Sequence, residues 1–70
     1  MTKFEAEIQL KKGRKIKHSY YTQDEFLYMK DDILYTEEDY PMGTLNDKFW
    51  KSIQKWEDGW ELYINKNINN

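Results

Sequence analysis

A chain of 70 residues without cysteine has room for one small domain, and it excludes both disulfides and zinc–thiolate sites as sources of stability. Its net charge of −2 and its three Trp, three Phe and six Tyr residues indicate a soluble domain stabilised by aromatic packing. No stretch approaches the roughly 20 apolar residues that cross a bilayer, and residues 1–10 do not resemble a signal peptide, so we expect a cytoplasmic protein.

The charge is unevenly distributed along the chain. Residues 1–18 carry six cationic side chains and two carboxylates, whereas residues 19–61 carry four lysines and eleven carboxylates. Such asymmetry gives a dipolar surface that can steer a charged partner. The richness in Lys, Asn, Ile and Tyr, with a single alanine and no valine, also points to an AT-rich genome, such as that of a low-GC bacterium or its phage.

The first element that the sequence predicts is a β-hairpin. Residues 3–10 alternate apolar and polar side chains with a period of two, which is typical of a strand with one buried face. Gly13 suits the turn, and a second strand follows over about residues 15–21. A three-residue loop keeps Leu10 opposite Ile16, whereas a two-residue turn would place lysines against the core, so the longer loop is favoured.

A helix is predicted next. The Thr-x-x-Glu pattern at residues 22–25 is typical of a capping box, which indicates a helix from residue 23 to about residue 30, with residues 33–36 extended. The alternative is a second hairpin, in which residues 26–29 pair with residues 33–36 around a Lys-Asp-Asp turn.

A second helix is predicted over about residues 45–57, capped by Thr44 after a loop over residues 37–43. Leu45, Phe49, Ile53 and Trp56 form its apolar stripe. Trp50 lies off this stripe and is either a core residue at the rim or an exposed anchor.

Gly59 is predicted to end that helix, and the alternation of residues 60–64 then predicts a final strand. These elements indicate a single α+β domain over residues 1–66 and a frayed polar tail over residues 67–70. The expected architecture is a small two-layer fold: a three-stranded antiparallel sheet, made of the N-terminal hairpin and the C-terminal strand, packed by two helices.

Side chains that could carry out catalysis are few. His18 is the only histidine, and it lies on the strand face that we expect to be apolar, which favours a structural role over that of a general base. The carboxylates at residues 31–32 and 37–39 lack the spacing and the glycine of a calcium loop. We therefore predict a protein that is not an enzyme and has neither cofactor nor metal site.

Two charged surfaces remain as candidate binding sites, although each also suits an ordinary solvated surface. The favoured one is acidic and rich in tyrosine, a residue enriched at interface cores, and its carboxylates could imitate DNA phosphates toward a basic protein. Its members are Asp24, Glu25, Tyr28, Asp31, Asp32, Tyr35, Glu37, Glu38, Asp39 and Tyr40.

The alternative is a nucleic-acid-binding site at the basic tip of the predicted hairpin, which the negative net charge disfavours. It would consist of Lys11, Lys12, Arg14, Lys15 and Lys17. A homodimer, formed through a free strand edge or through exposed aromatic residues, is a third possibility.

In its small size, acidity, tyrosine content and predicted order of hairpin and helix, the sequence resembles phage-encoded inhibitors such as the uracil-DNA glycosylase inhibitors and the anti-CRISPR proteins. The resemblance is one of type and size and assigns no role to any residue. It implies a phage or mobile-element protein that inhibits or modulates a basic host protein, for example one that binds nucleic acid.

Overall fold

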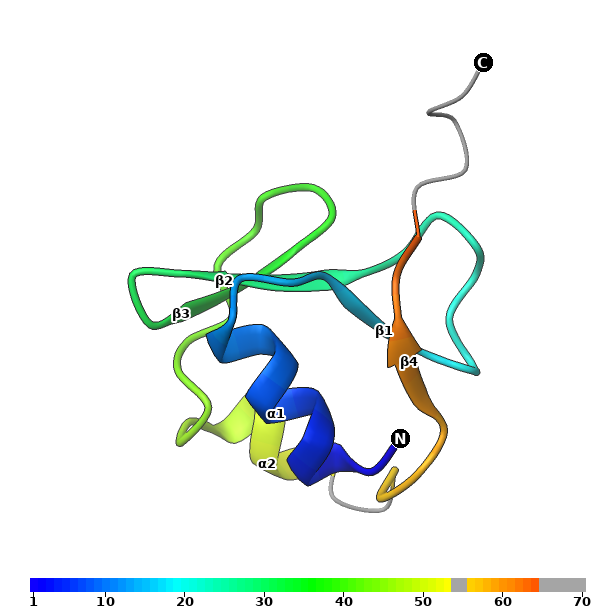
Figure 1. The fold of residues 1–70 in the computed structure, drawn as a ribbon. Coiled ribbons are helices and arrows are strands. Elements are labelled where there is room, and N and C mark those ends of the chain that lie inside the picture. Colours follow the sequence, from blue (N-terminus) through cyan, green and yellow to red (C-terminus); the bar gives the residue numbers. More distant parts are fainter. Residues whose placement is uncertain (54–55, 65–70) are drawn as a thin grey trace.

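In the computed structural model, which describes residues 1–53 and 56–64, two helices lie on one side of a four-stranded antiparallel sheet (Figure 1). The strand order in the sheet is β3-β2-β1-β4. The broad α+β class is therefore confirmed, but the prediction of three strands is wrong. Along the chain the elements are α1 (Lys3–Lys11), β1 (Ile16–His18), β2 (Leu27–Lys30), β3 (Ile33–Thr36), α2 (Lys48–Ser52) and β4 (Trp60–Leu62).

Residues 3–10 form a helix, so the predicted N-terminal strand, and with it the predicted hairpin, is wrong. The reason is a capping box that the alternation obscured. The Thr2 hydroxyl accepts a hydrogen bond from the Glu5 N–H (3.1 Å), and the Thr2 N–H donates to Glu5 Oε1 (2.8 Å). Satisfying two of the free N–H groups of the first turn in this way favours the helix.

Helix α1 packs on the sheet through positions at helical spacing. Lys3, Ala6 and Leu10 are buried, whereas Phe4 is 68% exposed and Ile8 is 37% exposed. Half of the apolar residues that the alternation placed on one strand face are therefore on the outside of the helix. No helix in the described part of the chain has the length and apolar character needed to cross a membrane.

Strands β2 and β3 form the hairpin that was the alternative for this segment, so the predicted helix over residues 23–30 is wrong. Tyr28 pairs with Tyr35 across the two strands. Asp31 and Asp32 form the connecting two-residue turn with φ angles of 54° and 69°, as a type I′ turn requires. Its backbone twist matches that of the strands, and cross-strand pairing then outweighs the local helix signal.

The predicted capping box at residues 22–25 forms only in part, because the Thr22 hydroxyl does not accept from the Glu25 N–H, and no helix follows it. The Thr22 N–H donates to Glu25 Oε1 (2.8 Å), and the Glu25 N–H donates to the Thr22 carbonyl oxygen (3.1 Å). The aromatic and branched residues that come next pair in the sheet instead, so this pattern marks only a turn.

Strand β1 lies inside the sheet and ends at His18, earlier than predicted. Ile16 pairs with Leu27 on one side and with Leu62 on the other, so the predicted pairing with Leu10 does not form. The predicted final strand is confirmed over Trp60–Leu62.

The outer edge of β3 is covered by the segment that comes after it in the chain. The Thr36 N–H donates to the Tyr40 carbonyl oxygen (3.0 Å), and the Met42 N–H donates to the Leu34 carbonyl oxygen (2.7 Å). A covered edge offers fewer free backbone groups to another chain.

Helix α2 begins later and is shorter than predicted. Its N-cap residue is Asp47 rather than Thr44, and the Thr44 N–H donates to Asp47 Oδ2 (2.8 Å). Residues 54–55 of the predicted helix and the predicted tail at residues 67–70 lie outside the described residues. Gly59 does not follow a helix directly but precedes β4, with a φ of 95°.

The core lies between the sheet and the helices. Trp50 is only 1% exposed and its ring centroid lies 5.1 Å from that of Trp60, so Trp50 is a core residue and not an exposed anchor. The buried apolar residues are Ala6, Leu10, Ile16, Leu27, Leu34, Trp50 and Trp60.

Candidate binding surface on the outer face of the sheet

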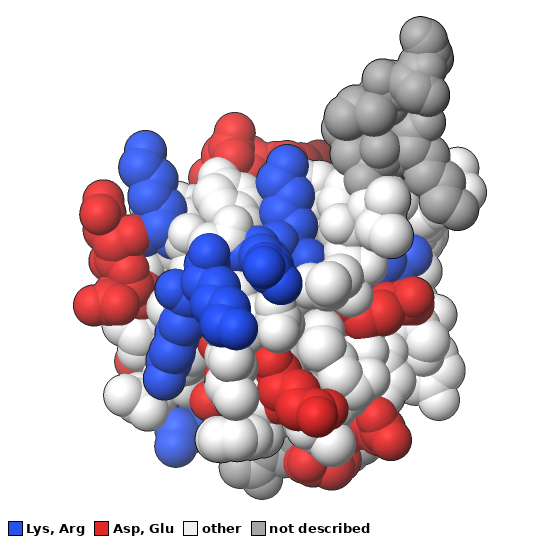
Figure 2. Space-filling model, in the orientation of Figure 1, with Lys and Arg blue, Asp and Glu red and all other residues white. Residues whose placement is uncertain are grey.

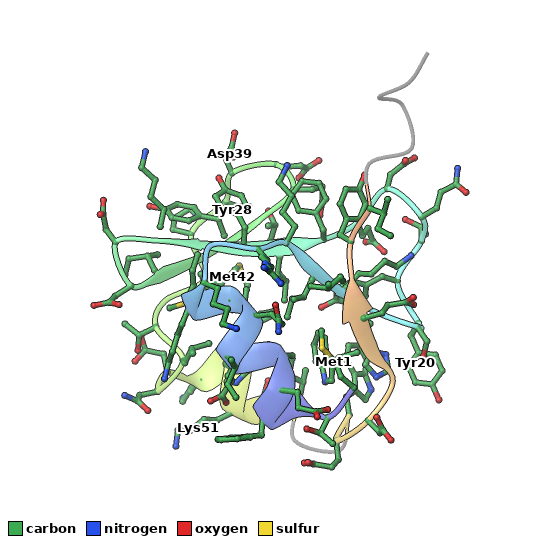
Figure 3. All side chains as sticks on the ribbon, viewed as in Figure 1. Met1, Tyr20, Tyr28, Asp39, Met42 and Lys51 are labelled. Carbon is green, nitrogen blue, oxygen red and sulfur yellow. The ribbon has the colours of Figure 1, made fainter. Side chains whose placement is uncertain are left out.

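Both helices cover the same face of the sheet, and within residues 1–53 and 56–64 no helix covers the opposite face, here called the outer face (Figure 1). Because successive side chains of a strand point to opposite faces, the burial of Leu27 and Leu34 turns Tyr28 and Tyr35 outward. Figure 3 shows Tyr28 and Asp39 on this side of the sheet, away from the helices.

Four half-buried rings form a continuous row across the outer face, here called the aromatic row: Tyr35, Tyr28, Phe26 and Tyr63. Tyr28 and Tyr35 are stacked, with centroids 5.4 Å apart and planes at 18°. Phe26 lies 6.3 Å from Tyr28 and 4.5 Å from Tyr63, centroid to centroid. Such pairs stabilise the sheet, and their outer surfaces remain available for contact.

An acidic loop, residues 37–40, lies against the Tyr28 end of the aromatic row. Asp39, with a φ of 63°, accepts a hydrogen bond from the Tyr28 hydroxyl through Oδ1. This bond, followed by burial and the charge of Asp39, raises the pKa of Tyr28 to about 12. The Thr36 hydroxyl oxygen accepts from the N–H groups of Glu38 and Tyr40 (both 3.3 Å) and thereby fixes the loop.

The structure brings together only part of the predicted acidic site. Tyr28 and Tyr35 lie side by side with the acidic loop, whose Tyr40 is 66% exposed. Asp31 and Asp32 lie in the β2–β3 turn, at the other end of β2.

The remaining two residues of the predicted site, Asp24 and Glu25, lie in the loop between β1 and β2. Burial and then the charges of Glu25 and Glu37 raise the pKa of Tyr21 to about 12. Glu25 and Glu37 therefore both lie near the Tyr21 hydroxyl group, although they belong to different loops. The predicted site is therefore divided among two strands, two loops and a turn, and none of its residues lies on a helix.

The predicted basic site is not a hairpin tip. Its five residues, here called the basic ridge, run from the end of α1 through the next loop to the start of β1: Lys11, Lys12, Arg14, Lys15 and Lys17. Figure 2 shows a group of Lys and Arg side chains close together where α1 ends against the sheet. Lys15 Nζ lies 4.7 Å from the Phe26 ring centroid, so the ridge meets the aromatic row.

Phe26 and Tyr63 are members of this surface that the sequence analysis does not include. Tyr63 follows β4 directly, and the alternation of residues 60–64 places it opposite Trp60 and Leu62. For Phe26 the favoured helix gives no such placement, whereas the alternative hairpin would place it on the same face as Tyr28, because alternate residues of a strand share a face.

His18 lies on the helical side of the sheet and is only 3% exposed. Nε2 lies 2.8 Å from the Asp58 carbonyl oxygen, and Nδ1 accepts from the Tyr20 N–H (3.2 Å). The ring stacks on Trp56 with centroids 4.5 Å apart. Both nitrogens are thus occupied by backbone groups, which assigns the Nε2–H tautomer and a role in packing.

A groove of about 810 Å³ lies on the helical side, with Lys3, Glu7, Trp50 and Lys51 among its lining residues. Its inner polar groups have partners within the protein. Lys3 Nζ donates to the Trp50 carbonyl oxygen (2.6 Å), and Trp50 Nε1 donates to Glu7 Oε2 (2.6 Å). Burial lowers the pKa of Lys3 from its ordinary value of 10.5, with Glu7 and Glu57 opposing this effect and Lys51 adding to it. These inner groups therefore need no ligand to satisfy them.

No protein-family model, no curated protein and no solved structure matches this chain. Within residues 1–53 and 56–64, no three His, Cys, Asp or Glu side chains converge as a metal site would require. The outer face, with its rings, acidic loop and basic ridge, is the surface whose composition best suits recognition.

Proposed function

We propose that this protein is a non-enzymatic binding module that binds a basic protein partner through the stacked tyrosines and the acidic loop of its outer face. The observation that carries the proposal is the hydrogen bond from Tyr28 to Asp39, which holds a carboxylate beside two stacked rings. Tyrosine provides contact area at low entropic cost, which is why it is common in binding hot spots.

The acidic loop is preorganised to bind a cationic side chain. Asp39 is exposed and is held by Tyr28, so less side-chain freedom is lost when a partner binds. A guanidinium group from the partner can pair with this carboxylate and lie against the Tyr35 ring. Glu37 and Glu38 add negative charge beside it, which would speed the encounter with a basic surface.

The biological setting that we propose is inhibition or modulation of a host protein in the cytoplasm by a phage or mobile-element product. The amino-acid composition and the small acidic chain support this setting. Homodimerisation has less support, because both edges of the sheet have partners within the chain. Residues 40–43 cover the edge of β3. At β4, the Met1 ammonium group donates to the Trp60 carbonyl oxygen (2.6 Å), and the Trp60 N–H donates to the Met1 carbonyl oxygen (3.1 Å). Light scattering tests it directly.

The proposal can be tested by NMR titration of the ¹⁵N-labelled protein with an arginine-rich peptide. We expect the largest chemical-shift changes in the acidic loop and at Tyr28 and Tyr35. The double variant Glu38→Gln/Asp39→Asn should weaken the peptide roughly tenfold, because each charge-assisted contact contributes about 1 kcal/mol or more. Asn tolerates the positive φ of position 39, so the loop should keep its shape.

A matched control is Glu57→Gln/Asp58→Asn, which also removes two negative charges but lies just before β4, outside the outer face. If both double variants weaken peptide binding equally, the attraction depends only on the net charge of the protein and the proposal is wrong. Capture of partners from a host lysate, with the same pair of variants, then extends the test to proteins.

A further inference from the structure

No ion pair joins a cation of the basic ridge to a carboxylate of the described residues, although Lys11 lines a groove with Glu7 and Asp32. In the described residues the one ion pair joins the Met1 ammonium group to Asp58 (3.8 Å), far from the ridge in the sequence. Arg14 Nη1 donates to the neutral Gln9 Oε1 (3.0 Å), and Lys12, Lys15 and Arg14 are exposed. Five neighbouring cations on a chain whose net charge is −2 form a local positive field that an anion can use.

One end of the basic ridge contacts the aromatic row. The Lys15 ammonium group lies over Phe26, and Phe26 and Tyr63 have centroids 4.5 Å apart with planes at 38°. Lys17 pairs across the strands with Glu61, which offsets part of its charge. A cluster of cations beside exposed ring surfaces on a sheet is the combination that binds phosphates and bases together.

We propose that the basic ridge and the Phe26–Tyr63 end of the aromatic row bind single-stranded nucleic acid. The phosphates would contact Lys12, Arg14 and Lys15, and unstacked bases would lie on Phe26 and Tyr63. A single strand fits better than a duplex, because only unpaired bases can offer their faces to rings that lie on a flat sheet. This site is separate from the acidic loop, so the two proposals stand or fall independently.

Fluorescence anisotropy with a labelled oligothymidylate of about 10 nucleotides, within the usual range of site sizes, measures this binding. A duplex of equal length is the comparison ligand. With three to five phosphate contacts, we expect the affinity for the single strand to fall roughly 20- to 100-fold between about 50 and 200 mM salt. The duplex should bind more weakly than the single strand at each salt concentration.

Two pairs of variants separate charge from stacking. Lys12→Gln/Lys15→Gln should weaken binding of the single strand and reduce its salt dependence, whereas Lys48→Gln/Lys51→Gln on α2 removes the same charge and should have a much smaller effect. Phe26→Leu keeps an apolar side chain but loses the ring, and we expect an affinity loss of roughly tenfold. Phe4→Leu removes an exposed ring from α1 and should leave the affinity unchanged.

Circular dichroism and thermal unfolding of each variant confirm that it is folded before its binding is measured. The proposal is overturned if the folded protein binds no single strand at low salt, or if the α2 lysine pair matters as much as the ridge pair. It is also overturned if Phe26→Leu binds as tightly as the parent protein. Glu38→Gln/Asp39→Asn should keep or raise oligonucleotide affinity, which distinguishes failure here from failure of the protein-binding proposal.

Discussion

Tyr28 donates a hydrogen bond to Asp39 across the outer face, and this bond contributes more than burial to raising the pKa of Tyr28 to about 12. The bond joins the middle of β2 to the acidic loop that comes after β3. It is therefore both a support for the loop and a reporter of its position, since any movement of the loop changes the titration of the phenol.

Replacement of Asp39 by Asn should lower the pKa of Tyr28 from about 12 toward its ordinary value of 10.0, because a neutral amide oxygen is a weaker acceptor and carries no charge. Ultraviolet absorbance of tyrosinate, compared with and without Tyr28→Phe in each background, isolates this phenol. Glu38→Gln is the control and should leave the titration in place. An unchanged titration in Asp39→Asn would show that the hydrogen bond does not persist in solution.

Stability should fall at alkaline pH. The pKa values of Tyr21 and Tyr28 in the folded state, about 12, lie above the ordinary value of 10.0, so the folded protein holds protons that the unfolded chain releases between these values. The contribution is thus fully present below about pH 10 and is lost as pH approaches 12. Urea unfolding at pH 9, 10 and 11 measures it, and Tyr21→Phe, which keeps the ring but cannot ionise, should flatten the decline. A stability that rises over this interval would contradict the prediction.

Gly59 and Gly13 provide a matched test of packing around His18. Both have positive φ angles, 95° and 84°, but a methyl group at Gly59 would lie 2.8 Å from His18 Nε2, whereas one at Gly13 would meet no atom within 4 Å. Gly13→Ala should cost about 1 kcal/mol of backbone strain, and Gly59→Ala about 2–4 kcal/mol because overlap with a buried ring is added. Thermal unfolding gives both values, and equal losses would mean that His18 is not packed as described.

Substitutions in the β2–β3 turn should increase the stability of the protein. Asp31 and Asp32 both adopt positive φ angles, which Asn-Gly adopts more readily in a type I′ turn. Asp31→Asn/Asp32→Gly should therefore stabilise the protein by about 1 kcal/mol, which chemical denaturation can measure. Asp24→Gly is the control: this aspartate is exposed and lacks a positive φ, so glycine there should give no gain. A loss of stability in the double variant would argue against the turn type.

Sequence patterns mislead where two signals compete over the same residues. At residues 3–10 a period of two predicts a strand, although Thr2 and Glu5 supply the same Thr-x-x-Glu pattern as residues 22–25 and there form a complete capping box. The same four-residue pattern begins a helix at one place and a turn at the other, because residues 27–30 find cross-strand partners and residues 6–11 do not. Such partners are distant in the sequence, and no local pattern reveals them.

The final strand was predictable, since Trp60 and Leu62 alternate with Glu61 in a short segment after a glycine. The acidic and basic sites were predictable as sequence clusters but not in their geometry. The stacking of Tyr28 on Tyr35 depends on the register of a hairpin, and the meeting of Lys15 with Phe26 depends on β1 and β2 being neighbours in the sheet. Composition indicates which side chains are present, and topology decides which of them are adjacent.

Pairing of β1 with β4 has a consequence for how the chain folds during synthesis. The interior strand β1 has one neighbour, β2, that emerges from the ribosome soon after it, and another, β4, that emerges only much later, with Trp60. Helix α1 must likewise wait for Trp50 before Lys3 and Glu7 acquire their partners. Nascent chains that stop short of these tryptophans lack much of the interior, so folding should be delayed until Trp60 has left the ribosome.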